Sequence, residues 1–354
     1  MTPLCAHLKA QIARTGPISV AEFMATCLLH PEHGYYSTGH PIGRRGDFVT
    51  APEISQMFGE MLGLALAQSW MDQGAPEACA LVELGPGKGT LMADVLRTIR
   101  AVPGFAEAVQ VHLVEASPSL KAAQHQALQG TPAQWHDTVD TLPGDLPVFL
   151  IANEFFDALP IRQFQRAENG WRERQIGLHE AELSFGLSAP APLAALDHRL
   201  DDTKPGDLVE TCPAAHPILQ TIGARIEANG GAALIFDYGD WRSLGDTLQA
   251  IRKHETVHPL SAPGDTDLTA HVDFEALVRD LPCAHSRLST QGVVLERLGI
   301  TQRAQSLAEG LDAEALENHI AAHRRLTHPG EMGTVFKSIA LFPSRGAPPP
   351  GYEQ

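Results

Sequence analysis

The sequence has no run of apolar residues long enough to cross a membrane as a helix. Its best apolar runs, such as residues 148–152 and 232–236, have the length of a strand, whereas a membrane helix needs roughly 18 or more apolar residues. We therefore expect no membrane insertion. With 354 residues, 44% of them hydrophobic, the chain has the composition of a globular protein with one large domain or two ordinary ones.

Basic residues are also scarce. The chain has 26 Lys and Arg residues against 42 Asp and Glu residues, which gives a formal net charge of −16. A surface of this sign repels the phosphate backbone of nucleic acids and attracts basic peptides. We therefore expect no nucleic acid partner, whereas a basic segment of another protein would be attracted.

Cysteine is sparse and irregularly spaced. The five cysteines form no C-x-x-C pair, and their number is odd. A disulfide framework and a structural zinc site are not expected, and we expect no bound metal. Residues Met1–Leu8 have the pattern of neither a signal peptide nor an organelle import leader. We expect a bacterial cytoplasmic protein, and a mitochondrial matrix location only if a leader is missing from this sequence.

Strand and helix patterns alternate from residue 80 onward. Strand-like apolar segments at 80–84, 109–114 and 148–152 are separated by helix-like segments at 90–100 and 118–128. This alternation predicts an α/β fold, in which helices cover both faces of a doubly wound parallel sheet.

The remaining segments complete the expected organisation. We expect an N-terminal helical cap and lid loop over residues 1–78, a core over 79–342 and a mobile tail over 343–354. Asn169–Gly170, between two alternating segments, predicts an antiparallel hairpin. This hairpin marks an inserted substrate-side element at about 160–210.

Two segments near this insertion are also interpreted. Residues 186–206 contain three prolines and are expected to form a loop that crosses back to the core. Asp267 and His271 lie in Asp-Leu-Thr-Ala-His-Val-Asp-Phe, which we interpret as the start of a helix capped by an Asp or by Thr269. The alternative is a catalytic role for Asp267 and His271.

The most specific local pattern is a strand that enters a glycine turn and opens a helix. Gly85, Pro86, Gly87 and Gly89 form a G-x-G-x-G turn, and Glu83 precedes the first glycine by two residues. Glycines let the backbone approach a ligand closely, and the helix start offers free N–H groups. Dinucleotide enzymes use G-x-G-x-x-G for a diphosphate, beside which a carboxylate at Glu83 would be poorly placed. An ammonium group, as in S-adenosylmethionine (SAM), suits it better.

A second acid follows the next strand. Glu115, with Ala116 beside it, lies 30 residues after Gly85, where an acid accepts from ribose hydroxyls in doubly wound folds. Asp137 follows the third strand, where it could bind an adenine amino group, with Trp135 packed nearby. The pattern predicts an adenosine ligand, and SAM is favoured over NAD. The alternatives are a ligand-free tight turn and a solvated strand end at Glu115.

The sequence resembles the MidA-type family of SAM-dependent methyltransferases, which is related to the mitochondrial protein arginine methyltransferase that assists NADH dehydrogenase assembly. The matching segments run in order through residues 16 to 342, and the first two are highly specific. They are Gly46–Glu60, Ala152–Pro160, Asp237–Gly239, Asp267–Phe274, Thr290–Gly292 and Met332–Lys337. The resemblance implies a class I SAM-dependent methyltransferase, with a Rossmann-like doubly wound sheet. It also implies SAM as cofactor and, for the mitochondrial relative, an arginine on an NADH dehydrogenase subunit as target.

Methyl transfer to arginine needs groups that orient a guanidinium and draw off its charge. Carboxylates pair bidentately with the guanidinium fork. We assign Glu154 and Asp157, at the end of the fourth strand, to guanidinium binding and Asn153 to orientation, with Phe155 or Phe156 as an apolar wall. These acids could instead cap the turn. The run also loosely imitates a motif that holds a planar amide or base amino group in other methyltransferases, but it lacks both prolines of that motif.

A loop with a specific sequence precedes the core. Asp47 and Phe48 are assigned to a lid over the cofactor, with Tyr36 just before it, and Thr50 is grouped with the cofactor-binding residues. The alternative is a helix-entry turn in which Phe48 fills the core. Asp237, at the end of another core strand, either borders the substrate cleft or acts as a cap.

Three functions remain open from the sequence. The first is a protein arginine N-methyltransferase that acts on an accessible arginine of a partner, such as an NADH dehydrogenase subunit, during assembly. The second is a small-molecule or glutamine N-methyltransferase. The third is an assembly chaperone that binds SAM without turnover. A homodimer is compatible with all three.

Overall fold

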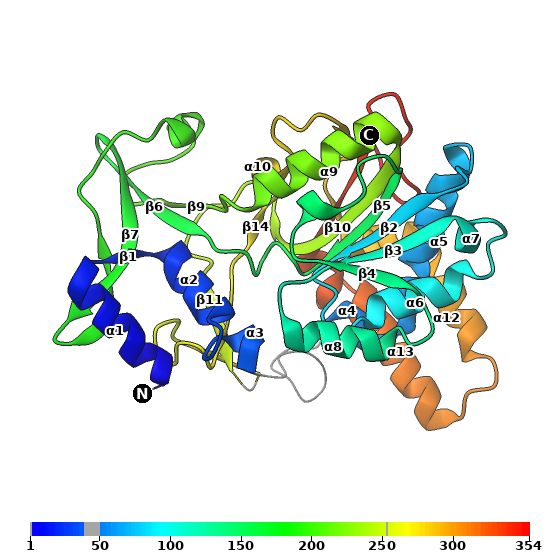
Figure 1. Cartoon of the computed structure of the whole chain (residues 1–354), viewed down its shortest axis with the longest axis horizontal. Coiled ribbons are helices and arrows are strands. Elements are labelled where there is room, and N and C mark those ends of the chain that lie inside the picture. Colours follow the sequence, from blue (N-terminus) through cyan, green and yellow to red (C-terminus); the bar gives the residue numbers. More distant parts are fainter. Residues whose placement is uncertain (1, 39–49, 253) are drawn as a thin grey trace.

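A computed structural model describes residues 2–38, 50–252 and 254–354 of the chain. The described residues form two lobes that lie side by side (Figure 1). The larger lobe is built on the central sheet, and the smaller one combines the N-terminal helices with antiparallel strands. In the part of the chain that the structure describes, no helix has both the length and the apolar character that a membrane span requires.

The central sheet confirms the predicted doubly wound fold. Its parallel strands run in the order β4-β3-β2-β5-β10, and β17 pairs antiparallel with β10. Their bounds are β2 (Cys79–Leu84), β3 (Val109–Val114), β4 (Ala133–His136), β5 (Val148–Asn153), β10 (Gly231–Asp240) and β17 (Phe336–Phe342). Short strands β14 (Val272–Asp273), β15 (Ala284–His285) and β16 (Ser289–Thr290) extend this sheet.

Helices cover both faces of the sheet. Successive residues of a strand point to opposite faces, so each strand contributes apolar side chains to both. Leu81 and Phe149 pack in one hydrophobic cluster with α5, α6 and α11. Val82 and Leu150 pack in another with α9 and α10. The helices of this lobe are α4 (Ala51–Ile54), α5 (Gln56–Asp72), α6 (Thr90–Ile99), α7 (Phe105–Ala108), α8 (Pro118–Ala127), α9 (Ala215–Asn229), α10 (Phe274–Val278), α11 (Gln291–Arg297), α12 (Ile300–Ala308), α13 (Ala313–Thr327) and α14 (Met332–Val335).

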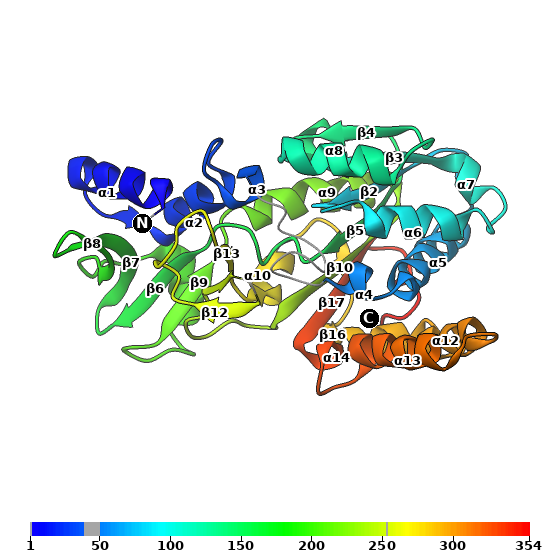
Figure 2. The same ribbon diagram turned by 90° about the horizontal axis from the view of Figure 1, so that it is seen from below.

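The smaller lobe has its own hydrophobic cluster, to which Leu8, Phe23, Ile176 and Leu268 contribute. Figure 2 shows its helices α1 and α2 beside the antiparallel strands, at the end of the molecule away from α12 and α13. Its elements are α1 (Pro3–Thr15), β1 (Ile18–Ser19), α2 (Val20–Leu29), α3 (Tyr35–Thr38), β6 (Arg162–Ala167), β7 (Gly170–His179), β8 (Glu182–Leu187), β9 (Leu208–Thr211), β11 (Gln249–Arg252), β12 (Glu255–Val257) and β13 (Asp267–Thr269). Short 3-10 helices lie at η1 (Val139–Thr141) and η2 (Ala194–Arg199).

The predicted hairpin is confirmed, because β6 and β7 pair antiparallel and Ala167 pairs with Gly170. The expectation that residues 186–206 cross back to the core is wrong. Leu196 packs with Phe164 and Trp171 in a small cluster, and β9 then pairs with β6. The apolar residues of this segment therefore keep it within the smaller lobe.

The expected helix start at Asp267 and Thr269 is also wrong. Both residues lie in β13, which pairs with β11. The helix α10 begins later, at Phe274, where the Asp273 side chain accepts from the backbone N–H of Ala276. The helix begins here because the Asp273 carboxylate caps the N–H of Ala276, which has no partner within the helix.

The expected limits of the N-terminal and C-terminal segments differ from the structure. Within residues 1–78, α1 and α2 belong to the smaller lobe, whereas α5 packs in the core of the larger one. The tail over 343–354, expected to be mobile, is anchored. Tyr352 is 7% exposed in the core, and its hydroxyl hydrogen-bonds Ser338. An aromatic side chain beyond the prolines thus holds the tail.

We expect Tyr352→Ala to lower the free energy of unfolding by about 3 kcal/mol, because it empties a large core position. Tyr352→Phe keeps the ring and should cost only about 1 kcal/mol for the lost hydrogen bond. Urea unfolding of both variants measures this difference. Equal stability of Tyr352→Ala and the native chain would show that the tail does not pack in solution.

Candidate active site

The site lies where the strand order reverses. From β2 the chain builds β3 and β4 on one side of the sheet and then returns to build β5 on the other side of β2. The loops after β2 and β5 therefore diverge and leave a crevice at the carboxyl ends of the strands. Glu83 and the glycine turn follow one strand, and Asn153 and Glu154 the other.

The glycine turn needs its glycines. Gly85 and Gly87 have φ of +59° and +54°, a region that other residues rarely adopt. A Cβ on Gly85 would lie 2.8 Å from the ring of Phe155. Gly89 has a different role, because it starts α6 with φ +83° and packs against α8. It does not line the cavities described below.

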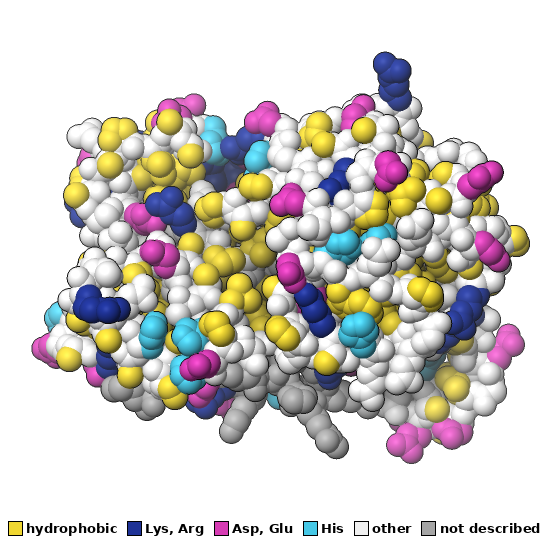
Figure 3. Space-filling model, in the orientation of Figure 1, with side chains coloured by type: hydrophobic (Ala, Val, Ile, Leu, Met, Phe, Trp, Pro, Cys, Tyr) yellow, Lys and Arg dark blue, Asp and Glu magenta, His cyan; other side chains and the backbone are white. Residues whose placement is uncertain are grey.

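The first cavity has a volume of about 510 Å³ and lies between the glycine turn, the end of β3 and α9. Its wall brings together many of the residues that the sequence indicated, namely Tyr36, Gly85, Gly87, Glu115, Ala116, Asp137, Glu154 and Phe155. On the face shown in Figure 3, hydrophobic side chains gather between the two lobes, whereas charges of both signs are dispersed around them.

Glu115 is held rigidly in this wall. It is 8% exposed, and its carboxylate accepts from the Ser117 N–H at 2.8 Å and from the Gln124 amide at 3.1 Å. Burial raises the pKa of Glu115, and these two donors oppose that rise. Asp137 is exposed and paired with Lys121, which lowers its pKa. Trp135 instead donates to Gln124.

The second cavity, of about 60 Å³, lies beneath the glycine turn and is lined in part by Thr50, Glu83, Pro86 and Asn153. Glu83 Oε2 and Asn153 Oδ1 are buried and have no hydrogen-bond partner among the described residues. Burial raises the pKa of Glu83 to about 8. Two unpaired acceptors without a donor fit a group that brings N–H donors and positive charge, such as an ammonium.

Glu154 lines all three cavities of the site. Its backbone has φ +52°, a conformation that costs energy for a residue with a side chain and that is concentrated at functional sites. Its carboxylate accepts from the Ala51 N–H at 3.3 Å and from the Asn153 amide at 3.1 Å. Glu154 therefore stands where the three cavities meet.

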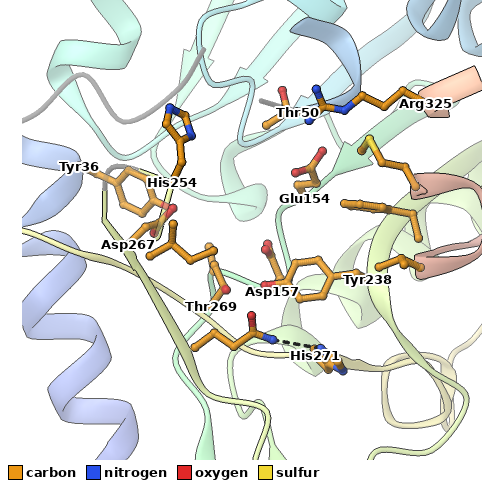
Figure 4. Close-up of a pocket in the computed structure, with 16 residues that line it drawn as sticks. Tyr36, Thr50, Glu154, Asp157, Tyr238, His254, Asp267, Thr269, His271 and Arg325 are labelled. Carbon is orange, nitrogen blue, oxygen red and sulfur yellow. Dashed lines mark hydrogen bonds between the residues drawn. The ribbon is translucent and has the colours of Figure 1, made fainter. Parts of the chain in front are cut away.

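The third cavity, of about 460 Å³, opens on the other side of Glu154. Figure 4 shows Asp157 and Asp267 lining it from different elements, with Tyr238 beside Asp157 and Arg325 reaching toward Thr50. Tyr238 packs edge-to-face on Phe336. The cavity thus combines carboxyl groups with an aromatic wall.

The acids of the third cavity have shifted pKa values. Burial, with a further contribution from Asp157, raises the pKa of Glu154 to about 7. Burial raises the pKa of Asp157 to about 7. Asp157 Oδ1 has no hydrogen-bond partner among the described residues. A cationic ligand would favour the charged form of both acids.

Three sequence-based assignments need correction or fall outside the described residues. Asp237 does not border the cavities, because it is fully buried and accepts from the N–H groups of Phe156 and Asp157 at 2.9 and 3.3 Å. It holds the turn that carries Asp157. Phe156 is buried in the core, and Phe155 lines the first cavity but is not part of the lining of the third. Asp47 and Phe48 lie outside the described residues.

Sequence reasoning missed several residues of the third cavity. Tyr238 was quoted only as part of a strand end, and for Asp267 a helix start was favoured over the catalytic alternative. Alternation with an apolar residue between Asp267 and Thr269 could have indicated a strand. Arg325 lies in a polar helix, α13, and only the packing of α13 beside α4 brings it to the cavity. No sequence signal pointed to Arg325.

Comparisons with known proteins agree on a family. The model of a family of S-adenosyl-L-methionine-dependent methyltransferases matches residues 61–294. The mitochondrial protein arginine methyltransferase NDUFAF7 of Xenopus laevis is 39% identical over 95% of this chain and 84% of its own length. The Homo sapiens protein of the same name is 35% identical over 97% of this chain and 84% of its own length.

Two crystal structures of Burkholderia thailandensis proteins are also similar. One was determined with S-adenosyl-homocysteine (SAH) bound, and it matches with a TM-score of 0.84 and 29% identity. The other matches with a TM-score of 0.81 and 28% identity. Each comparison covers 97% of this chain and 92% of the other. The similarity therefore extends over both lobes.

We expect Glu115→Ala to weaken SAH binding by about 1 to 3 kcal/mol, because a charged acceptor is lost from a buried wall. Titration calorimetry measures the change. The control is Glu107→Ala, which removes an equal charge from an exposed position on α7 and should leave affinity unchanged. If both variants bind SAH like the native chain, Glu115 does not contact the cofactor.

Proposed function

This chain belongs to the MidA-type family of SAM-dependent methyltransferases, and we propose that it transfers the methyl group to an arginine side chain of a protein. The observation that supports this most is the meeting of the first and third cavities at Glu154. One cavity has the residues for the cofactor, and the other has the acids and aromatic rings for a cationic side chain.

The first and second cavities fit SAM. Glu83 and Asn153 would accept from its ammonium group, because both carry unpaired buried acceptors. Glu115 would accept from the ribose hydroxyls, and Asp137, which lines the same cavity, would accept from the adenine amino group. When bound, SAM supplies a methyl group on a positively charged sulfur. The Phe155 ring packs against Gly85 in the space that a Cβ would occupy, and both residues line the first cavity.

The third cavity fits an arginine. Glu154 and Asp157 would pair with the guanidinium, whose fork suits carboxylates. The ring of Tyr238 would face its planar cation, and Ile251, Met332 and Val335 supply apolar surface for the side-chain methylenes. Because Glu154 also lines the first cavity, this position brings a guanidinium nitrogen toward the cofactor.

A guanidinium nitrogen that accepts the methyl group would form a C–N bond while the bond between the SAM sulfur and the methyl carbon breaks, which leaves neutral SAH, and the nitrogen would release one proton. Asp157 is suited to accept the proton, because its Oδ1 is free among the described residues and its pKa is raised to about 7 by burial. Asp237 fixes the backbone of Asp157 in the orientation that this transfer needs. Glu154, whose pKa is likewise raised to about 7 by burial, would pair with the guanidinium in its charged form.

The other two functions fit the cavity less well. A neutral glutamine amide or an uncharged metabolite would leave carboxylates of the third cavity buried and unpaired, which costs free energy. A chaperone without turnover would not need the free carboxylate oxygen of Asp157 in the third cavity. These alternatives become the outcomes of the experiments below.

The proposed partner is a protein that presents an arginine in an accessible segment before assembly. The chain has a net charge of −16, which favours the approach of a basic segment. Relatives at 35 to 39% identity are named mitochondrial protein arginine methyltransferases. From the family resemblance of the sequence we propose an NADH dehydrogenase subunit as target.

We expect the native chain, incubated with methyl-labelled SAM and lysate of its source cell, to label a protein on arginine, as mass spectrometry would show. Glu154→Gln should lower the rate at least about tenfold, since a charged hydrogen bond contributes about 1.5 kcal/mol or more, while SAH affinity changes little. The control is Glu173→Gln on β7, where Glu173 pairs with Arg162; it should leave the rate unchanged. Label on glutamine or on metabolites alone would favour the second function, and no label the third.

The assembly state of the target gives a separate test. We expect isolated NADH dehydrogenase subunits from a deletion strain to be labelled, and the assembled enzyme from the same strain to be labelled far less. The physical reason is that an arginine buried by assembly cannot enter a cavity of about 460 Å³ inside another protein. Equal labelling of both preparations would contradict the proposal that methylation precedes assembly.

A further inference from the structure

Gln124 is a fully buried polar residue on α8 that lines none of the three cavities. Its amide nitrogen donates to the carbonyl of Gly87 at 2.9 Å and to the carboxylate of Glu115 at 3.1 Å. Its amide oxygen accepts from the Trp135 indole at 2.9 Å. Both contacts of the amide nitrogen therefore lead to residues that line the first cavity.

We propose that Gln124 is a positioning residue that fixes the glycine turn and the carboxylate of Glu115 relative to each other. The inference rests on the cofactor position proposed above, and it is independent of the methyl acceptor. Gly87 follows β2 and Glu115 follows β3, so the two belong to separate loops. Gln124 joins these loops through one amide group.

Trp135 sets the orientation of the Gln124 amide. Trp135 is a donor only, so the amide oxygen must face the indole, and the nitrogen must face Gly87 and Glu115. The indole is itself held by His125, whose ring lies 3.7 Å away between centroids. Trp135 thus acts on the first cavity through Gln124, although the sequence suggested that it packs near adenine.

The close packing of α8 leaves Gln124 little freedom. A Cβ on Gly89 would lie 3.3 Å from the Cα of Gln124, so the glycine turn and α8 are already in contact at that point. The amide reaches Gly87 without an intervening side chain. A shorter or apolar residue at position 124 would leave the Gly87 carbonyl and the Trp135 indole without partners.

The pH dependence of SAH binding also reflects the charged groups around Glu115. Glu83 on β2 faces Glu115 and interacts with it through its charge. Lys121 on α8 lowers the pKa of Glu115, as do the donors from Ser117 and Gln124. The carbonyl of His136 on β4 accepts from the Glu115 N–H, and burial lowers the pKa of the His136 imidazole. The same neighbours are present in every variant below.

Two substitutions give opposite pH trends if Gln124 donates to Glu115. Gln124→Leu removes the donor, so the pKa of Glu115 rises, and the loss of SAH affinity relative to the native chain grows as pH falls. Gln124→Glu places a second carboxylate there, which repels Glu115 at high pH. As pH falls, the two carboxylates share one proton and form a hydrogen bond, so the loss of SAH affinity becomes smaller.

Calorimetric titration with SAH between about pH 6 and 9 measures both trends. We expect Gln124→Leu to weaken SAH binding about tenfold at pH 7, as for a lost hydrogen bond to a charged group. Gln126→Leu, an identical change at an exposed position of α8, should bind like the native chain. Thermal unfolding in the presence and absence of SAH identifies variants that fail to fold.

The outcomes separate the proposals. Opposite pH trends in the Leu and Glu variants support the positioning role, whereas parallel trends or unchanged affinity overturn it. If Gln124→Leu does not fold, the pH dependence of SAH affinity in Gln124→Glu decides whether the positioning role holds. A loss of affinity that becomes smaller as pH falls supports it, and any other result overturns it. If Glu115→Ala also binds SAH normally, the proposed cofactor position fails. Arginine labelling by the native chain is unaffected by either result and tests the methyl acceptor alone.

Discussion

The parallel pairing of β2 with β5 is the constraint on which the site depends. Glu83 pairs with Ile151, and Leu84 pairs with Ala152, so the two strands end at nearly the same level. The glycine turn after β2 and the acids after β5 therefore meet at one edge of the sheet. A shift of this register by one residue would turn Glu83 to the opposite face.

The site concentrates carboxyl groups in a place where burial opposes their charge. Glu83, Glu154, Asp157 and Asp237 all have pKa values raised by burial. For such groups ionisation is more favourable in the unfolded chain, so stability is lost as pH rises from the unfolded pKa toward the folded pKa. A bound cation offsets this loss. The arrangement is unfavourable for the empty protein and favourable for a protein that binds positively charged ligands.

Local patterns predicted the parts of the structure that depend on neighbours along the chain. The glycine turn, the strand ends at Glu115 and Glu154 and the Asn169–Gly170 hairpin each have a short-range physical signature, and the structure places them in the expected elements. The misread parts depend on distant partners. Asp267 belongs to a strand only because β11 pairs with it, and Arg325 and Gln124 reach the site only through helix packing. A sequence read locally cannot supply those contacts.

The composition of the smaller lobe has a consequence for how the chain folds during synthesis. Its hydrophobic cluster joins α1 and α2 to Ile176 on β7 and to Leu268 on β13. The apolar faces of α1 and α2 are therefore covered only after most of the chain has left the ribosome. Contacts of such long sequence separation form slowly, and the exposed helices are vulnerable to aggregation in the interval. The central sheet also needs a late element, because β10 pairs with β17. Both lobes are thus expected to be completed only near the end of synthesis.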